Sequence, residues 1–229
     1  MARRKRLTLI ATGAVTLLAG TTAVAAVVVG TSGNDSLLGT QLADTIRGLS
    51  GDDTLLGLGG PDEVFGGSGD DDLNGDGACP ANLVGSPYNC LPGPDGRDRV
   101  FGGSGQDTIR GEDGRDRLSG QGGDDRIRGG RGRDRVVGGS GEDVLFGGRG
   151  NDHMTGAGGD DILRGNTGRD NLNPGSGRDR GFGGRGRDRL RTRDNTRDIV
   201  NCGPGRDVAR VDPRDLVRRN CERVLRRRG

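Results

Sequence analysis

The chain has almost none of the side chains from which ordinary globular cores are built. Its 229 residues include no tryptophan, one tyrosine and four phenylalanines, and Lys5 is the only lysine. Glycine contributes 49 residues and proline eight, together about a quarter of the chain. Without a period this composition would indicate disorder, and it excludes a conventional globular core.

Side chains suited to catalysis are equally scarce. His153 is the only histidine and falls at an outward position of a repeat, where a solvated residue is favoured over a general base. No serine lies in a G-x-S-x-G motif, and the four cysteines suit disulfide bonds. The sequence therefore predicts a protein that is not an enzyme.

The first 26 residues differ from the rest of the chain. Basic residues at 3–6 precede an apolar run from Leu7 and the small residues 23–25, a pattern typical of a secretory signal peptide spanning 1–26. An uncleaved membrane anchor is the alternative, because 7–29 is nearly long enough to span a bilayer. Removing four of the 35 basic residues leaves 31 against 33 acidic ones, so the net charge changes from +2 to about −2.

The rest of the chain has a nine-residue period. Counted in nines from Asp35 to Asp188, sixteen of eighteen phases hold aspartate, and the exceptions are Pro80 and Asn89. Glycine stands two residues before each aspartate except at Leu42, and an aliphatic residue or methionine stands two residues after it except at Gly181. The unit is G-G-x-G-x-D-x-U-x, in which U is apolar and aspartate holds position six.

This unit resembles the RTX, or haemolysin-type, calcium-binding nonapeptide repeats. The resemblance covers about 30–191 and implies an all-β fold, a parallel β-roll (β-solenoid) over 27–191 in which two repeats make one turn. It also implies Ca²⁺ as the cofactor, bound by the position-six aspartates.

The physical chemistry of the unit agrees with the resemblance. Glycines at positions one and four permit positive φ in tight turns, and positions seven to nine form a short strand whose central residue faces inward. Stacked turns place equivalent aspartates about 4.8 Å apart, where two charges repel by about 3 kcal/mol at an effective dielectric near 20. A cation must sit in this column, and calcium accepts carboxylate and main-chain oxygens in irregular geometry.

Alternate repeats fall on two edges of such a roll. We call the first the acidic edge, because acidic or amide residues precede most of its aspartates: Asp35, Asp53, Asp71, Asp107, Asp125, Asp143, Asp161 and Asp179. The second is the arginine edge, with the aspartates Asp44, Asp62, Asp98, Asp116, Asp134, Asp152, Asp170 and Asp188. Its position five holds Arg97, Arg115, Arg133, Arg169 and Arg187, and its position seven holds Arg99, Arg117, Arg135 and Arg189.

The arginines make calcium binding at their own edge doubtful. Arginine beside a carboxylate weakens calcium electrostatically and can pair with the carboxylate itself. We therefore expect Asp98, Asp116, Asp134 and Asp170 to be largely satisfied by arginine and bound ions to crowd the acidic edge. The alternative is that arginine only solubilises a lysine-poor chain.

Two segments depart from the repeat. The insert at 75–92 has the length of two repeats and three prolines, so we expect an extruded loop that leaves Phe65 and Phe101 as neighbours. Those rings support the loop, or with Tyr88 bind a surface polymer. The segment 192–229 resembles the closing segment of similar actinobacterial proteins and is interpreted as a C-terminal cap. Four cysteines allow three pairings, and proximity favours Cys79 with Cys90 and Cys202 with Cys221.

The favoured function is a secreted, extracellular calcium-binding repeat protein, structural or associated with the cell surface, whose roll folds on binding calcium. The first alternative is a binder of an anionic polymer or nucleic acid through the arginine edge, although interleaved aspartates and few aromatic residues argue against it. The second is the non-catalytic remnant of a toxin or enzyme of the resembled family. We expect calcium ions as partners, no nucleic acid, no membrane insertion after signal cleavage, and a cell-surface polymer or protein not identified by the sequence.

Overall fold

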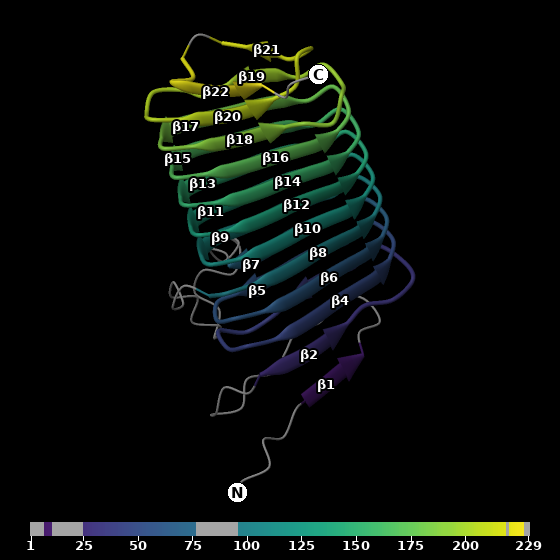
Figure 1. The fold of residues 1–229 in the computed structure, drawn as a ribbon. Helices are drawn as coiled ribbons and strands as arrows, with labels where there is room; N and C mark the ends of the chain where they lie inside the picture. The colour runs from purple at the N-terminus through teal and green to yellow at the C-terminus, as the bar shows by residue number, and fades with distance from the viewer. Residues whose placement is uncertain (1–6, 11–24, 77–95, 219, 227–229) are drawn as a thin grey trace, which may run out of the picture.

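The chain forms a parallel β-solenoid of two facing sheets, with strands stacked turn upon turn (Figure 1). This computed structural model describes residues 7–10, 25–76, 96–218 and 220–226. Within those ranges all regular structure is β-strand, which confirms the predicted all-β roll. No helix in the described part is long and apolar enough to cross a membrane.

Strands alternate between the two sheets along the chain. The first sheet has twelve strands: β1 (Leu7–Ile10), β2 (Ala26–Val29), β4 (Thr45–Ser50), β6 (Glu63–Ser68), β8 (Arg99–Ser104), β10 (Arg117–Gly122), β12 (Arg135–Ser140), β14 (His153–Gly158), β16 (Asn171–Ser176), β18 (Arg189–Thr192), β20 (Val208–Val211) and β22 (Arg223–Arg226). The second has ten: β3 (Ser36–Leu38), β5 (Thr54–Leu58), β7 (Asp72–Asp76), β9 (Thr108–Gly114), β11 (Arg126–Gly132), β13 (Val144–Gly150), β15 (Ile162–Gly168), β17 (Arg180–Gly186), β19 (Ile199–Asn201) and β21 (Leu216–Val217).

The register confirms that one turn takes two repeats. In the first sheet Arg117 pairs with Arg99 on one side and Arg135 on the other, each eighteen residues away. Equivalent repeat positions therefore stack in columns along the solenoid. The turns from the first sheet to the second form the acidic edge, and those from the second to the first form the arginine edge.

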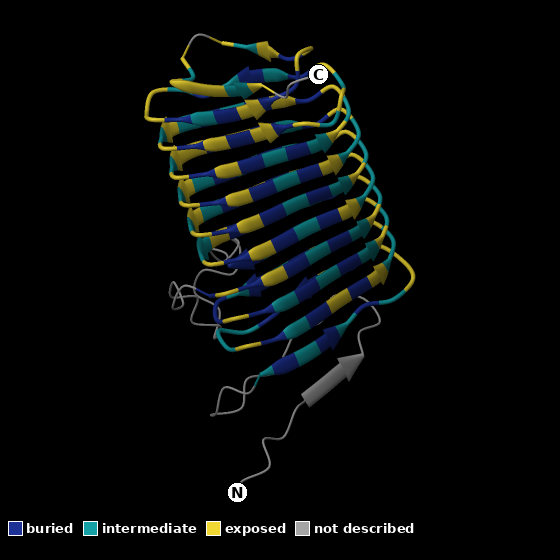
Figure 2. Cartoon of the chain, in the orientation of Figure 1, coloured by how far each residue is buried: buried dark blue, intermediate teal, exposed yellow. Residues whose placement is uncertain are grey.

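Each repeat points three residues into the interior. In the repeat of β13, Asp143, Leu145 and Gly147 are buried, whereas Val144 and Phe146 between them are half-buried (Figure 2). This is the alternation of a strand whose one face is covered. From β8 to β17 every strand has six or seven residues, so the predicted three-residue strands were too short there: pairing continues through positions one to three.

The predicted roles of the glycines need one correction. Most position-four glycines take positive φ as expected, for example Gly132 at 143° and Gly141 at 126°. Among the described residues no position-one glycine has positive φ, and Pro174, whose ring fixes a negative φ, occupies that position in one repeat. Position two takes positive φ instead, even at Gln121 (83°). Glycine holds position one in most repeats for the steric reason given below.

The turns on either side of the insert pack directly on each other. β6 pairs with β8 and β7 with β9, so residues 36 apart become neighbours where 18 is the rule. The rings of Phe65 and Phe101 stack with centroids 5.2 Å apart and planes 9° apart, which confirms that prediction. The segment 77–95, with Cys79, Tyr88 and Cys90, lies outside the described residues.

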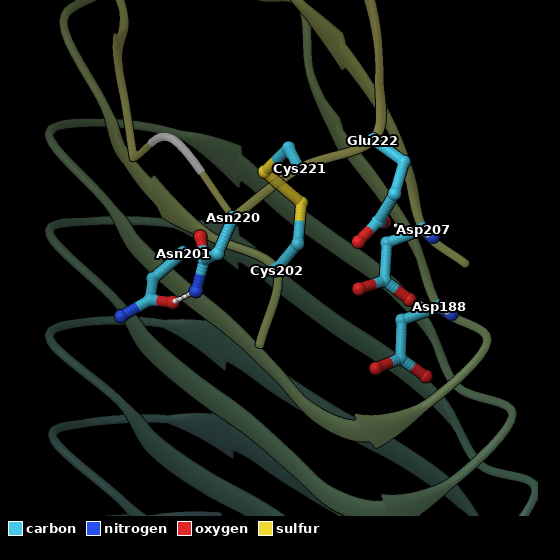
Figure 3. Close-up of a disulfide and its surroundings, with 7 residues drawn as sticks. All are labelled: Asp188, Asn201, Cys202, Asp207, Asn220, Cys221 and Glu222. Atoms are coloured by element: carbon cyan, nitrogen blue, oxygen red, sulfur yellow. Dashed lines mark hydrogen bonds between the residues drawn. A yellow bond between two sulfur atoms is a disulfide. The ribbon is translucent and has the colours of Figure 1, made fainter. Parts of the chain in front are cut away.

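The segment after residue 191 continues the roll with irregular turns. β18, β20 and β22 extend the first sheet, and β19 and β21 end the second. The predicted disulfide between Cys202 and Cys221 is present, with Cα atoms 5.1 Å apart (Figure 3). It links the residue that follows β19 to the segment just before β22. Cys202 is fully buried, so the link lies inside the last turns.

The N-terminal strand pair lies at the opposite end. β1, within the predicted signal peptide 1–26, pairs in parallel with β2. Ala26 falls at the phase of the missing aspartate, and its N–H donates to Asp44 Oδ1 at 2.5 Å. The contacts that repeat along the roll therefore begin at Ala26.

Candidate metal centre

The position-six aspartates lie inside the roll. Each stands two residues before a core side chain and therefore shares its inward-facing side of the strand. All sixteen are buried, and Asp143 and Asp161 have no exposed surface. The predicted ligands thus form two internal columns, one along each edge.

From Asp44 onwards, one oxygen of each position-six carboxylate accepts a main-chain N–H of the neighbouring turn. The N–H of Asp107 donates to Asp125 Oδ1 at 2.9 Å, and the N–H of Asp125 donates to Asp143 Oδ1 at the same distance. The arginine edge repeats the pattern, with the N–H of Asp116 donating to Asp134 Oδ1 at 3.0 Å. We call these columns the aspartate ladders. Their hydrogen bonds fix each carboxylate in one orientation.

The other oxygen is buried without a hydrogen-bond partner. Asp35 and Asp44 are exceptions at the first turns, since their Oδ2 atoms accept N–H groups of Thr31 and Thr40. The orphaned Oδ2 atoms belong to Asp53, Asp62, Asp71, Asp98, Asp107, Asp116, Asp125, Asp134, Asp143, Asp152, Asp161, Asp170, Asp179, Asp188, Asp198 and Asp207. A buried, unpaired carboxylate oxygen is costly, so each ladder requires protons or cations.

Burial and mutual repulsion raise the pKa values of the ladder carboxyls. Desolvation is the larger cause, and it raises the pKa of Asp62 to about 9, with the charges of Asp98 and Asp44 adding to the effect. The pKa of Asp116 rises to about 8 and that of Asp125 to about 7, again chiefly through burial and then through neighbouring aspartates. Near neutral pH the carboxyls of the metal-free ladders are therefore partly protonated.

The surroundings of the orphaned oxygens suit calcium. A Cβ added at Gly120 would overlap Asp125 Oδ2 and would lie 2.9 Å from the carbonyl oxygen of Gly138 on the next turn. The absent side chain thus leaves the space in which a carboxylate and a main-chain carbonyl approach each other. Calcium binds this combination of oxygens. We call this arrangement of a carboxylate oxygen and a carbonyl oxygen around a position-one glycine the glycine cradle. It recurs at Gly66 and Gly102, and it explains why position one is mostly glycine although its φ is not positive.

The acidic edge has a second, outer ladder. The N–H of Asp70 donates to Asp52 Oδ1 at 3.0 Å, and the N–H of Glu142 donates to Asp124 Oδ1 at 2.8 Å. These position-five side chains are exposed and accept from the following turn, whereas the inner ladder accepts from the preceding one. Sequence reasoning noted the acidic residues but not their hydrogen bonds. They place a further row of carboxylates beside the inner one.

The predicted pairing of arginines with ladder aspartates was wrong. The described residues contain three ion pairs, Arg99–Glu63, Arg110–Asp72 and Arg131–Asp113, none with a ladder aspartate. Asp98, Asp116, Asp134 and Asp170 have the same orphaned Oδ2 as the aspartates of the acidic edge. The reason is strand alternation, which sends position six inward and positions five and seven outward.

Both ladders extend beyond the predicted end of the repeats. On the acidic edge the N–H of Asp179 donates to Asp198 Oδ1 at 2.9 Å. On the arginine edge the N–H of Asp188 donates to Asp207 Oδ1 at 2.7 Å, and the N–H of Asp207 to Glu222 Oε2 at 2.6 Å (Figure 3). Sequence reasoning missed these residues because the spacing becomes 19 and then 15. The available signal was an aspartate two residues before Val200 and Ala209.

A third carboxylate joins the acidic ladder at its C-terminal end. Single oxygens of Asp179, Asp194 and Asp198 lie within 4.8 Å of one another. Asp194 comes from the irregular turn after β18, where it accepts from Thr196 Oγ1 at 2.6 Å. Because Asp179 and Asp198 both have orphaned Oδ2 atoms, this cluster is suited to the same cation as the repeats.

The two-sheet roll with its buried carboxylate ladders defines a parallel β-solenoid of the metal-binding repeat class. The model of the RTX calcium-binding nonapeptide repeat matches at residues 29–64, 47–77, 93–127, 119–154 and 155–190. These matches span more than half of the chain, which therefore belongs to this family of calcium-binding repeats. No curated protein sequence matches the chain.

The cradle can be tested with two substitutions in the same strand. Gly120→Ala should lower calcium affinity and the unfolding temperature, because the methyl group would displace Asp125 Oδ2. Gly122→Ala is the matched control: its Cβ would meet Ser140 Oγ at 3.3 Å and the carbonyl oxygen of Gly103 at 3.9 Å, and no ladder carboxylate. Calcium titration and thermal unfolding of both variants measure the effect, and equal behaviour of the two would contradict the proposed cradle.

The ladders also predict an unusual pH dependence. The carboxyl pKa values of about 7 to 9 at Asp98, Asp116 and Asp62 lie above the unfolded value near 4, so the folded metal-free form holds extra protons. Lowering the pH from 8 to 5 in chelator should therefore raise the fraction of metal-free protein that is folded, as measured by circular dichroism. In calcium the stabilisation by the ion should shrink over that range, because protons compete for the same oxygens. A smaller folded fraction in chelator at pH 5 than at pH 8 would refute this.

Proposed function

We propose that this protein is a secreted, non-enzymatic, calcium-dependent β-roll with a structural role outside the cell or at its surface. The observation that carries the proposal is the unbroken column of buried Oδ2 atoms without partners along each edge. The sixteen position-six aspartates of the repeats would hold the ions, together with main-chain carbonyls such as that of Gly138. Asp194, Asp198 and Asp207 would extend the sites to the end of the roll.

Calcium would act by reversing the sign of the interaction within each ladder. Carboxylates on adjacent turns are about 4.8 Å apart and repel by about 3 kcal/mol at an effective dielectric near 20. The core offers little compensation, because each repeat buries a single apolar side chain such as Leu145 or Val136. An ion bound between turns attracts both, so its binding free energy becomes folding free energy. Millimolar calcium, as in extracellular modules, suits this role.

The two edges would bind calcium with different affinity. Both present the same orphaned oxygens, so both are candidate sites. The acidic edge adds exposed carboxylates such as Asp124 and Glu142, which attract the ion. The arginine edge adds exposed cations such as Arg115 and Arg133, which repel it through space. The predicted difference between the edges therefore remains as a difference in affinity: both edges bind calcium, and the acidic edge binds it more tightly.

Secretion is supported by the sequence pattern of 1–26 and by the position of Ala26. Cleavage after Ala25 would leave the amino group of Ala26 at the atom that lies 2.5 Å from Asp44 Oδ1. A new ammonium group would thus cap the first carboxylate of the arginine-edge ladder. Processing is expected after Ala25 or Ala26, so mass spectrometry of the protein from culture medium should find a terminus at residue 26 or 27, and an intact Met1 in that material would refute the processing step.

Folding on calcium is tested by circular dichroism of the chelator-treated protein. Added calcium should produce the β-sheet spectrum cooperatively, with heat release in parallel calorimetry. The double variant Asp125→Asn, Asp143→Asn should bind fewer ions and require more calcium to fold than the wild type. The matched pair Asp116→Asn, Asp134→Asn should lose only the weaker sites. A spectrum unchanged by calcium, with no heat, would overturn the proposal.

A further inference from the structure

The arginine edge carries a continuous groove that the calcium ladders do not explain. Two hollows of about 380 and 290 Å³ adjoin there, sharing Arg133 and His153 in their linings. The larger hollow is lined by Arg97, Arg99, Arg115, Arg117, Arg133 and Arg135, with His153 and the aspartates beneath. Arg169, Arg189, Asn151 and Asn171 continue the lining into the smaller one.

The surface of this groove is cationic although the sequence alternates arginine with aspartate. Asp98, Asp116 and Asp134 are at most 2% exposed, whereas the arginines that flank them at positions five and seven are exposed. The interleaved acids therefore do not reach solvent, which removes the main sequence argument against an anionic ligand.

The arginines form two parallel rows with few counter-charges. Arg99, Arg117 and Arg135 are direct partners on adjacent strands of the first sheet, and so lie about 4.8 Å apart. A second row, at position five, runs along the other side of the aspartate ladder. Of the six arginines in the larger hollow, only Arg99 forms an ion pair within the described part of the chain, with Glu63. Rows of like charge at this spacing are stabilised by an anion that bridges them.

We propose that this groove binds a linear phosphate polymer without bases, laid along the solenoid axis. Guanidinium groups bind phosphate with paired hydrogen bonds, and the oxygens of one phosphate point in several directions. A phosphate between the rows can accept from position five on one side and position seven on the other. Among the described residues no phenylalanine, tyrosine or tryptophan lines either hollow, and the single imidazole of His153 offers little of the stacking surface used for single-stranded nucleic acid.

The test compares two variants with the same change of charge. In the groove variant, Arg115, Arg117, Arg133 and Arg135 are replaced by glutamine. In the control variant, glutamine replaces four exposed arginines that line neither hollow: Arg178, Arg180, Arg191 and Arg210. The probe is inorganic polyphosphate, with binding measured in calcium at several salt concentrations.

The groove variant should bind polyphosphate at least about tenfold more weakly, with a salt dependence reduced by about one unit of slope per lost contact. The control variant should bind like the wild type. Equal weakening of both variants would show generic attraction and overturn the proposal, as would absent binding. Tighter binding of heparin, or of single-stranded DNA with equal charge, would overturn the phosphate polymer in favour of those ligands.

A measurement on the wild-type protein avoids any dependence on how the variants fold. Polyphosphate should protect Arg115 and Arg133 from modification by phenylglyoxal while Arg191 stays reactive. Uniform protection of all three arginines would contradict a groove-specific site.

The two glutamine variants have their own control: circular dichroism of each variant in calcium tests whether the roll is retained.

Discussion

The structure depends on one constraint: each repeat places a carboxylate on the buried face of its strand. Strand alternation allows no other outcome, because position six lies two residues before the core residue. One oxygen finds a main-chain N–H on the neighbouring turn, as Asp125 Oδ1 does with Asp107. The second oxygen has no hydrogen-bond donor in the described part of the chain, so it needs a proton or a cation. The glycine cradle, the raised carboxyl pKa values and the need for a cation near neutral pH all follow from this buried carboxylate.

The two edges share this interior and differ in what surrounds it. On the acidic edge the exposed position-five residues form a second ladder, as from Asp52 to Asp70. On the arginine edge the corresponding side chains extend into solvent and line a groove. One sequence period of nine thus builds a structural period of eighteen. This division permits a cation to be held within the roll and an anion to be held on its surface.

Much of the fold could be predicted from the sequence, because the period is strict. Sixteen aspartates in phase indicated stacked turns, and the register of Arg117 with Arg99 and Arg135 confirms two repeats per turn. The length of the insert predicted that Phe65 would meet Phe101, since it preserves the phase. The disulfide of Cys202 with Cys221 followed from proximity alone.

What the sequence could not predict depends on side-chain direction and on irregular turns. Arginine next to aspartate in sequence suggested a pair, but adjacent strand residues face opposite ways, so Arg115 and Asp116 do not meet. Position-one glycine was assigned to turn formation, whereas its role is to admit Asp Oδ2 of its own repeat. The ladder members Asp198 and Asp207 were hidden by turns of 19 residues.

Anomalous scattering from crystals grown in calcium tests directly whether the orphaned carboxylate oxygens are calcium ligands. Calcium peaks should form a row along each edge, each peak in contact with aspartate Oδ2 atoms, with the stronger row at the acidic edge. Folded rolls whose Oδ2 atoms contact no cation at either edge would contradict this prediction.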